Sequence, residues 1–289
     1  MYVIEISGLK KRFEKGGFCL DLPEMRVPEG YITGFIGENG AGKTTTLKLM
    51  MDMLYPDEGT IRILGLDAHL QGPQVRAQIG YVGSTPGYLA HATLETLKRM
   101  HAPFYPNWDE ALYRRFCDRF SLDGKKKYKD LSTGKQKQFS ICIALSHHPK
   151  LLLMDEPTAN LDPLARQEIL DILTEELQRE GVSVFFSTHI TSDLDKIADY
   201  VQFLHHGRLL IAGEKDRICE GNRVVKGPLH LLTPETEPLF VNLRRSEFGF
   251  TGLTGCPDEV FSLLGDEAVY EKPTVEDIFL GYTQAERGH

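Results

Sequence analysis

A short glycine-rich run, Gly37-Glu38-Asn39-Gly40-Ala41-Gly42-Lys43-Thr44, constrains this chain more than any other feature. It matches the phosphate-binding loop pattern of Gly, four residues, Gly, Lys and Ser or Thr. A β-prone apolar run, 31–36, leads into it and a helix-like run, 44–50, leads out of it. The sequence therefore predicts a strand, a phosphate-binding loop and a helix, and with them a nucleoside triphosphate site.

The residue types in this loop suit phosphate and magnesium. Its glycines allow main-chain amides to approach phosphate oxygens closely, and the following helix adds about half a positive charge at its N-terminus. Lys43 is expected to reach the β- and γ-phosphates, and the Thr44 hydroxyl to take one position on Mg²⁺. The candidate nucleotide contacts in the loop are Gly37, Glu38, Asn39, Gly40, Ala41, Gly42, Lys43, Thr44 and Thr45.

Two later strands are predicted to carry the remaining chemistry. The apolar run 151–154 ends in Asp155 and Glu156, as a buried parallel strand does when it delivers carboxylates at its C-terminal edge. We expect Asp155 to hold Mg²⁺ through water and Glu156 to polarise the attacking water. A second strand, 182–188, is rich in β-branched and aromatic residues and has His189 at its tip.

Two further segments flank the acidic strand. Leu131-Ser132-Thr133-Gly134-Lys135-Gln136 opens a helix-like segment that runs to about residue 147, and Asn160-Leu161-Asp162 follows the acids. In this order and at these spacings, the five motifs resemble the nucleotide-binding domain of an ATP-binding cassette (ABC) transporter. The resemblance covers residues 1 to about 215 and implies ATP and Mg²⁺ as ligands and ATP hydrolysis as the activity.

The resemblance also implies roles for single residues. Residues 37–45 look like Walker A, Asp155 like the Walker B aspartate, Glu156 like the catalytic glutamate and His189 like the switch histidine. Lys43, Glu156 and His189 are thus the expected catalytic groups, and Thr44 and Asp155 the expected metal site. Ser132 and Gly134 match the signature loop, which in that family caps the γ-phosphate of ATP on the opposite subunit. Asp162 matches the D-loop aspartate, and Phe13 sits where the family places an aromatic ring on adenine.

Two departures from the family pattern stand out. Ser84 appears at the position after the strand 79–82 where the family usually has Gln, and serine is too short to span the same distance. Either a water molecule, Thr85 or another loop residue takes the place of the missing Gln side-chain amide, or the alignment with the family is shifted at this position. Thr133 and Lys135 replace the commoner Gly and Gln in the signature, and Lys135 would add a cation near the γ-phosphate of the opposite subunit.

Composition limits the class of protein. The 289 residues are 41% hydrophobic and 26% charged, as in an ordinary globular protein. No run reaches the ~18 apolar residues that cross a membrane, and no signal-peptide pattern is present, so we expect a cytosolic chain without direct membrane insertion. A net charge of −8 argues against general nucleic-acid binding. Five scattered cysteines argue against disulfides and structural zinc, and the paired histidines 147–148 and 205–206 point apart in any regular element.

The order of the segments predicts an α/β fold. We expect a P-loop NTPase core, with a mostly parallel sheet flanked by helices, an N-terminal antiparallel β-subdomain and a helical insertion at about 88–147. Residues 1–215 would form the nucleotide-binding domain, and 216–289 a small C-terminal extension. The ending 272–280 resembles the close of cassette subunits that serve ABC-2-type exporters.

The resemblance implies two partners. The first is a transmembrane permease, which the subunit would energise at the inner face of the cell membrane; the C-terminal ending implies that this permease belongs to an exporter. The second is another nucleotide-binding subunit, identical or different, which would complete two ATP sites head to tail. Two alternatives stay open from the sequence. One is a soluble cassette ATPase that acts on ribosomes or DNA, although such chains usually carry two cassettes. The other is a regulatory module without turnover, which Glu156 and His189 disfavour and Ser84 keeps open.

Overall fold

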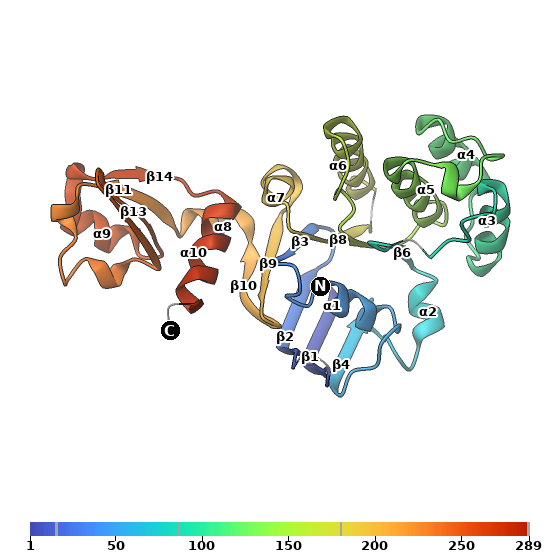
Figure 1. The fold of residues 1–289 in the computed structure, drawn as a ribbon. Coiled ribbons are helices and arrows are strands. Elements are labelled where there is room, and N and C mark those ends of the chain that lie inside the picture. Colours follow the sequence, from blue (N-terminus) through green and yellow to red (C-terminus); the bar gives the residue numbers. More distant parts are fainter. Residues whose placement is uncertain (15–16, 86, 180, 288–289) are drawn as a thin grey trace. The chain divides into compact units, whose positions relative to one another are not determined.

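The computed structural model describes residues 1–14, 17–85, 87–179 and 181–287 (Figure 1). Their contacts form two units, the first from Met1–Ile190 with Leu204–Leu209, and the second from Thr191–Phe203 with the chain from Leu210 onward. The sequence-based boundary near residue 215 therefore differs from the division by contacts. Residues 191–203 group with the C-terminal part because they contact its last helix, as described below.

Alternating apolar residues build an antiparallel sheet at the start of the first unit. It contains β1 (Tyr2–Arg12), β2 (Cys19–Pro28), β4 (Glu58–Ile63) and β5 (Leu66–Asp67), in the order β2-β1-β4-β5. Ile6 of β1 lies opposite Met25 of β2 and Ile61 of β4, and all three side chains are buried. This sheet is the N-terminal β-subdomain that the sequence predicts.

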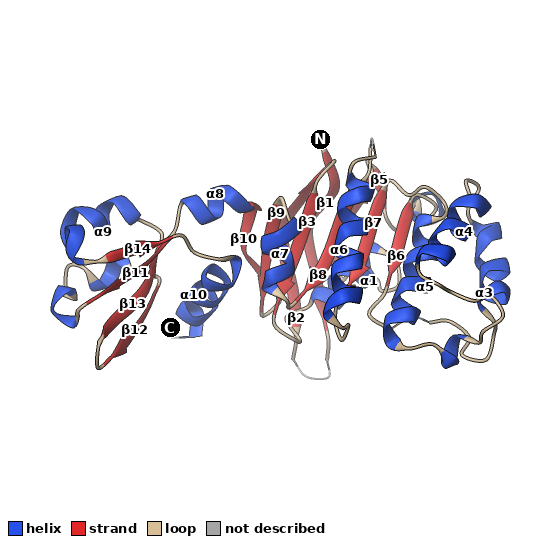
Figure 2. Cartoon of the chain, turned by 90° about the horizontal axis from the view of Figure 1, so that it is seen from above, coloured by secondary structure: helices blue, strands red, loops and turns tan. Residues whose placement is uncertain are grey.

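A parallel sheet gathers the predicted site motifs at one edge. The strands β3 (Ile32–Gly37), β8 (Ser183–Thr188), β7 (Leu151–Asp155) and β6 (Ile79–Val82) lie side by side in that order (Figure 2). Every residue of β3, β7 and β8 is buried, as continuous apolar runs in a parallel sheet require. Ser187 pairs with both Phe35 and Asp155, so the carboxyl ends of β3, β8 and β7 meet.

Helices cover this sheet and extend beyond it. The chain forms α1 (Lys43–Met50), α2 (Gly72–Arg76), α3 (Leu94–His101), α4 (Glu110–Arg119), α5 (Thr133–Leu145) and α6 (Pro163–Leu177), with short 3₁₀ turns at Ala102–Phe104 and Tyr128–Asp130. Leu47 of α1 belongs to the same buried cluster as Leu153 and Phe185 of the sheet. α3, α4 and α5 lie together, as Figure 1 shows, and form the predicted helical insertion.

Polar caps mark the starts of these helices. Thr93, Asp109 and Ser132 accept hydrogen bonds from the main-chain amides of Thr96, Leu112 and Lys135 respectively. Such caps satisfy amides that have no partner within the helix. The start of α5 at the Ser132 cap agrees with the sequence, which places a helix from this residue to about 147.

The second unit is mixed α/β. It includes α7 (Thr191–Ile197), most of β9 (Tyr200–His205) and β10 (Arg208–Glu214), α8 (Lys215–Glu220), β11 (Arg223–Gly227), β12 (Asn242–Ser246), β13 (Gly249–Thr254), α9 (Pro257–Leu264), β14 (Val269–Glu271) and α10 (Val275–Arg287), with 3₁₀ turns at Leu229–Leu231, Glu237–Leu239 and Gly265–Glu267. Its antiparallel sheet has the order β12-β13-β11-β14. The α10 amide of Val275 donates to Asp195 of α7 at 3.1 Å, and Phe203 packs edge-on against Phe279 at 5.5 Å.

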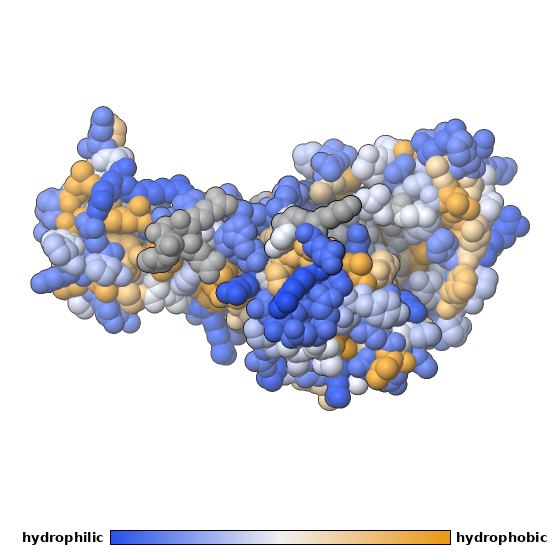
Figure 3. Space-filling model, turned by 60° about the horizontal axis from the view of Figure 1, so that its bottom comes forward, coloured by the Kyte–Doolittle hydropathy of each residue, from blue (hydrophilic) through white to orange (hydrophobic). Residues whose placement is uncertain are grey.

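The described part of the chain contains no helix that is long and apolar enough to span a membrane. On the face shown in Figure 3, apolar surface occurs in separate patches within a mostly hydrophilic surface. This finding agrees with the absence of a long apolar run in the sequence.

Candidate nucleotide site

The phosphate-binding loop connects β3 to α1. Gly40 and Gly42 have φ angles of +83° and +113°, which residues with a side chain rarely adopt. A Cβ atom on Gly42 would also lie only 2.9 Å from the ring of Phe18. The loop therefore requires glycine at 42 for both its main-chain angle and its packing.

Lys43 lies beneath this loop with only 6% of its surface exposed. Its ammonium donates to the carbonyl oxygens of Gly37 at 2.6 Å and Glu38 at 3.3 Å, and lies 3.3 Å from a carboxylate oxygen of Glu156. The loop carbonyls thus hold the lysine head at the mouth of the loop. The positive charge of the Lys43 ammonium can therefore attract an anion that enters between Lys43 and Glu156.

Thr44 and Asp155 come together although they are 111 positions apart. The Thr44 hydroxyl donates to Asp155 Oδ2 at 2.8 Å, and the Ser187 hydroxyl donates to Asp155 Oδ1 at 2.6 Å. A hydroxyl and a carboxylate supply the hard oxygen ligands that Mg²⁺ prefers, so this pair fits the predicted metal. Ser187, which the sequence analysis did not single out, fixes the orientation of the carboxylate.

Glu156 stands at the centre of the arrangement. One of its carboxylate oxygens faces Lys43, and the other accepts a hydrogen bond from His189 Nδ1 at 2.8 Å. Glu156 is largely buried, whereas His189 is half exposed at the end of β8. The sequence predicts that each residue lies at the tip of a strand, and the pairing of β7 with β8 in the structure brings the histidine to the acid.

The loop and Glu156 enclose a cavity of about 220 Å³. It is lined by Phe18, Glu38, Asn39, Gly40, Gly42, Lys43, Thr44, Thr45 and Glu156. Phe18 was not among the predicted site residues. The predicted adenine contact, Phe13, packs against Phe18 with ring centroids 6.2 Å apart, so the two aromatic rings adjoin at this side of the cavity.

The signature residues lie elsewhere in the first unit. Ser132, Gly134 and Asp162 line a separate cavity of about 550 Å³, together with Lys135 and Glu168. Within this chain they do not join Lys43 and Glu156. Asp162 accepts hydrogen bonds from the amides of Leu164 and Ala165 and so caps α6, while the ammonium of Lys135 donates to the Phe120 carbonyl.

A buried lysine that the sequence analysis missed adjoins the site. Lys137 of α5 is 4% exposed, and its ammonium donates to the carbonyl oxygens of Gly83, Glu156 and Asp155. Burial lowers the pKa of this ammonium, against the opposing effect of the nearby Asp155 and Glu156 carboxylates. The sequence feature that could have indicated this position is a lysine at the start of the helical segment 137–145, whose other residues are mostly apolar and are all buried.

Ser84 directly follows Gly83 and is exposed. It lies after β6, at the position where the sequence analysis noted the missing glutamine. On the preceding strand, burial, with the Asp155 carboxylate nearby, raises the pKa of Tyr81 to about 12. The phenol is therefore neutral at physiological pH and adds no charge beside the site.

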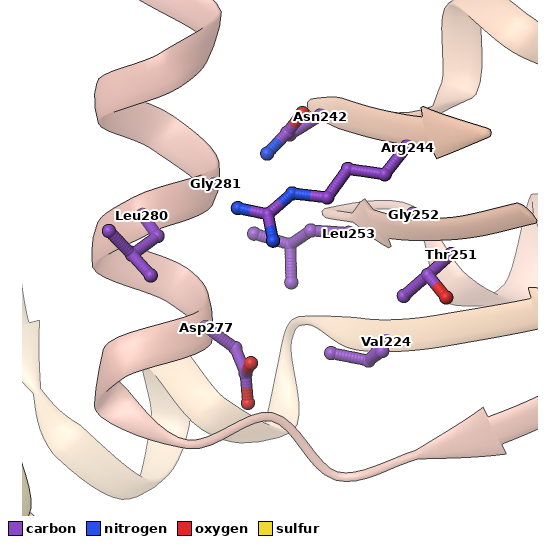
Figure 4. A pocket seen from close by; sticks show the side chains of 9 residues that line it. All are labelled: Val224, Asn242, Arg244, Thr251, Gly252, Leu253, Asp277, Leu280 and Gly281. Carbon is purple, nitrogen blue, oxygen red and sulfur yellow. The ribbon is translucent and has the colours of Figure 1, made fainter. Parts of the chain in front are cut away.

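The second unit has its own pocket, between α10 and strands β11 to β13. Arg244 and Asn242 of β12 project toward α10, and Asp277 lies on α10 across from them (Figure 4). Both β12 side chains donate to Gln284 Oε1 of α10. A Cβ on Gly281 would lie 2.3 Å from Leu253, so α10 packs directly on β13. The pocket lies at the edge of this helix-on-sheet contact.

The first unit can therefore perform one kind of chemistry. A parallel sheet presents a glycine loop, a lysine, an oxygen pair suited to Mg²⁺, a carboxylate and a histidine at one edge. Groups of these kinds are the ones that neutralising and orienting a phosphoryl group for attack by water requires. Such a fold and site define a P-loop nucleoside triphosphatase.

Comparisons with known proteins identify the branch of that class. A family model described as "ABC transporter" matches residues 20–159. The chain is 30% identical over 211 residues to the bacitracin transport ATP-binding protein BcrA of Enterococcus faecalis, covering 72% of this chain and 68% of the relative. It is 32% identical over 234 residues to the daunorubicin/doxorubicin resistance ATP-binding protein DrrA of Streptomyces peucetius, covering 78% and 70%.

Solved structures agree in fold. The ATP-binding subunit of an ABC transporter matches with a TM-score of 0.67 and 29% identity, covering 75% of this chain and 92% of that one. The dimeric ATP-binding cassette MJ0796 bound to ADP and Pi matches with a TM-score of 0.63 and 21% identity, covering 73% and 98%.

The chain belongs to the ABC transporter family, as an ATP-binding subunit. It binds and hydrolyses ATP with Mg²⁺, and acts with a transmembrane permease and a second nucleotide-binding subunit.

Proposed function

We propose that this subunit drives export and works at the inner face of the cell membrane. Two observations support the direction. The segment 272–280, near the C-terminus, resembles the close of cassette subunits that serve ABC-2-type exporters, and one relative is named for resistance to daunorubicin and doxorubicin. Outward transport of a toxic compound is one way in which a cell resists it.

In the proposed reaction each group at the edge of the sheet has one task. Lys43 and the amides of residues 37–45 bind the β- and γ-phosphates, and Thr44 with Asp155 holds Mg²⁺, which neutralises phosphate charge when bound. Glu156 accepts a proton from the attacking water, and His189 orients the γ-phosphate and that water. The single observation that carries this assignment is the contact of Glu156 with both Lys43 and His189.

Three further residues are proposed to act across a dimer. Ser132, Gly134 and Asp162 share a cavity that is separate from the cavity of Lys43, so they are free to contact ATP held by a second subunit. Ser132 caps α5, and the N-terminus of that helix favours an anion. Phe13 remains the proposed adenine contact, with Phe18 beside it.

Transport in inside-out membrane vesicles tests the direction. The subunit is expressed with its permease partner, and uptake of a labelled candidate compound into the vesicles is measured with Mg²⁺ and ATP. Export predicts ATP-dependent accumulation inside these vesicles, and its loss with EDTA or with Lys43→Ala. Accumulation only in right-side-out vesicles loaded with ATP would show import instead.

A further inference from the structure

Lys137 connects three segments through one ammonium group. Its Nζ lies 3.1 Å from the Gly83 carbonyl, 3.1 Å from the Glu156 carbonyl and 3.4 Å from the Asp155 carbonyl. The lysine itself belongs to α5, five residues after the helix cap at Ser132. An ammonium group has three donor hydrogens, and three main-chain acceptors match that number.

The contact with Glu156 bears on backbone strain. Glu156 has a φ angle of +51°, in the left-handed region that residues with a side chain seldom occupy. Such a conformation persists only where surrounding contacts fix it. The Glu156 amide donates to the Ser187 carbonyl at 3.1 Å, and the Glu156 carbonyl accepts from Lys137. The Glu156 carbonyl also accepts from the Ala159 amide at 3.3 Å. The peptide groups on both sides of this strained residue are therefore held, one by Ser187 and the other by Lys137 together with Ala159.

The contact with Gly83 extends the same link to a surface loop. Gly83 immediately precedes the exposed Ser84, and its carbonyl accepts from Lys137. A displacement of this loop alters the geometry at Lys137, and the same ammonium holds the Glu156 carbonyl. The path consists of main-chain carbonyls and one buried side chain, so it does not depend on the side chain at position 84.

We propose that Lys137 is a positioning residue for Glu156 and that it couples the loop at Ser84 to this carboxylate. The proposal rests on the proposed role of Glu156 as the base. Lys137 is not among the residues that line the cavity of the phosphate loop, and its ammonium fixes the main chain from which the carboxylate projects. Its removal should therefore impair turnover while leaving ATP binding at the phosphate loop intact.

Lys137→Met tests the proposal, because methionine keeps most of the length and removes all three donors. We expect ATP affinity to change by less than about threefold and kcat to fall by about tenfold to a hundredfold, the loss typical of a catalytic group displaced by about 1 Å. Amide hydrogen exchange of the nucleotide-free protein should accelerate in the segments 79–85 and 152–160. Lys137→Gln, whose side-chain amide retains two donors, should recover most of the turnover.

Lys98→Met is the matched control. Lys98 is also nearly buried in the helical insertion, but its ammonium pairs with Glu95 and Glu110. We expect this variant to lose stability without the change in kcat or in exchange at 152–160. If Lys137→Met does not fold, Lys137→Gln and exchange decide the question alone. Turnover within twofold of the unaltered protein in Lys137→Met, or a uniform loss of ATP binding and turnover together, would overturn the proposal. Absence of hydrolysis in the unaltered protein would instead refute the proposed function.

Discussion

At the scale of single residues, each charged group of the site has a partner of opposite charge or a hydrogen-bond donor beside it. Lys43 faces Glu156 at 3.3 Å, Glu156 accepts from His189, and Asp155 is held by Thr44 and Ser187. We therefore propose separable tasks for Lys43 and Glu156. Lys43 would supply positive charge for phosphate, and Glu156 would supply a proton acceptor.

Two substitutions separate these tasks. Lys43→Ala removes the phosphate charge, so ATP affinity should fall by more than about tenfold, equivalent to about 1.4 kcal/mol. Glu156→Gln leaves Lys43 in place and releases it from the carboxylate, so ATP affinity should be retained while kcat falls by about a hundredfold to ten-thousandfold. Equilibrium binding of a fluorescent ATP analogue and steady-state hydrolysis measure the two effects. Equal loss of affinity in both variants would contradict the assignment.

Ser84 gives a second test at this scale. The groups that neutralise and orient phosphate are all present without an amide at position 84, so Ser84→Gln should change the ATPase rate of the isolated subunit by less than about tenfold, or 1.4 kcal/mol of barrier. The effect should appear when the permease is bound. Rates of both forms with and without the permease decide this. A hundredfold gain in the isolated subunit would identify Ser84 as a catalytic defect and favour the regulatory-module interpretation.

At the scale of elements, the chain just after α5 contains a buried histidine that is not part of the site. His147 is 1% exposed, stacks on Tyr105 with ring centroids 3.9 Å apart, and has no hydrogen-bond partner for either ring nitrogen within the described residues. Burial lowers the pKa of this imidazole to about 4. The helical insertion therefore holds His147 in its neutral form.

Stability should depend on pH through His147. The unfolded chain takes up a proton near the ordinary histidine pKa of about 6.5, whereas the folded chain resists it down to about 4. The contribution of neutral His147 to the free energy of unfolding is therefore fully present above pH 6.5. It is lost as the pH falls toward 4, and the total loss is at most about 3 kcal/mol. His147→Phe keeps the ring stack and should flatten this dependence. Urea unfolding followed by fluorescence of Trp108, the single tryptophan, measures it. Parallel curves for the two proteins would show that His147 does not contribute.

At the scale of the whole molecule, we propose that two separate cavities in the first unit contribute complementary halves of a composite site. One contains Lys43 and Glu156, and the other contains Ser132, Gly134 and Asp162. A second copy, or a different cassette subunit, can bring the two halves together. Assembly is then expected to depend on bound ATP.

ATP should drive dimerisation of the Glu156→Gln variant, because slow hydrolysis preserves the nucleotide that joins the two halves. Adding Gly134→Glu introduces a negative charge beside the incoming phosphate and should prevent dimerisation without loss of ATP binding. Sedimentation velocity at micromolar protein and saturating Mg²⁺ and ATP distinguishes these outcomes. A monomer in Glu156→Gln under these conditions would point to an obligate, different partner subunit.

The sequence by itself determined the features whose physics is local. The loop 37–44 is a run of consecutive residues, so its glycines and Lys43 identify phosphate chemistry without any knowledge of the fold. The strand before Asp155 and the helix cap at Ser132 likewise follow from neighbouring residue types. The role of Ser132, Gly134 and Asp162 toward a second subunit and the role of Phe13 came from the family resemblance, and both remain predictions.

Tertiary structure decided the features that depend on residues far apart in the chain. Ser187 lies 32 positions from Asp155, and Lys137 is 19 positions from Glu156 and 54 from Gly83. Serine and lysine occur throughout an ordinary sequence, so neither type marks a position as part of the site. Only the pairing of β7 with β8 places the Ser187 hydroxyl within hydrogen-bond distance of the Asp155 carboxylate. The packing of α5 beside β6 likewise brings the Lys137 ammonium to the Gly83 and Glu156 carbonyls. A buried charge must find its partners in three dimensions, and a linear pattern does not record them.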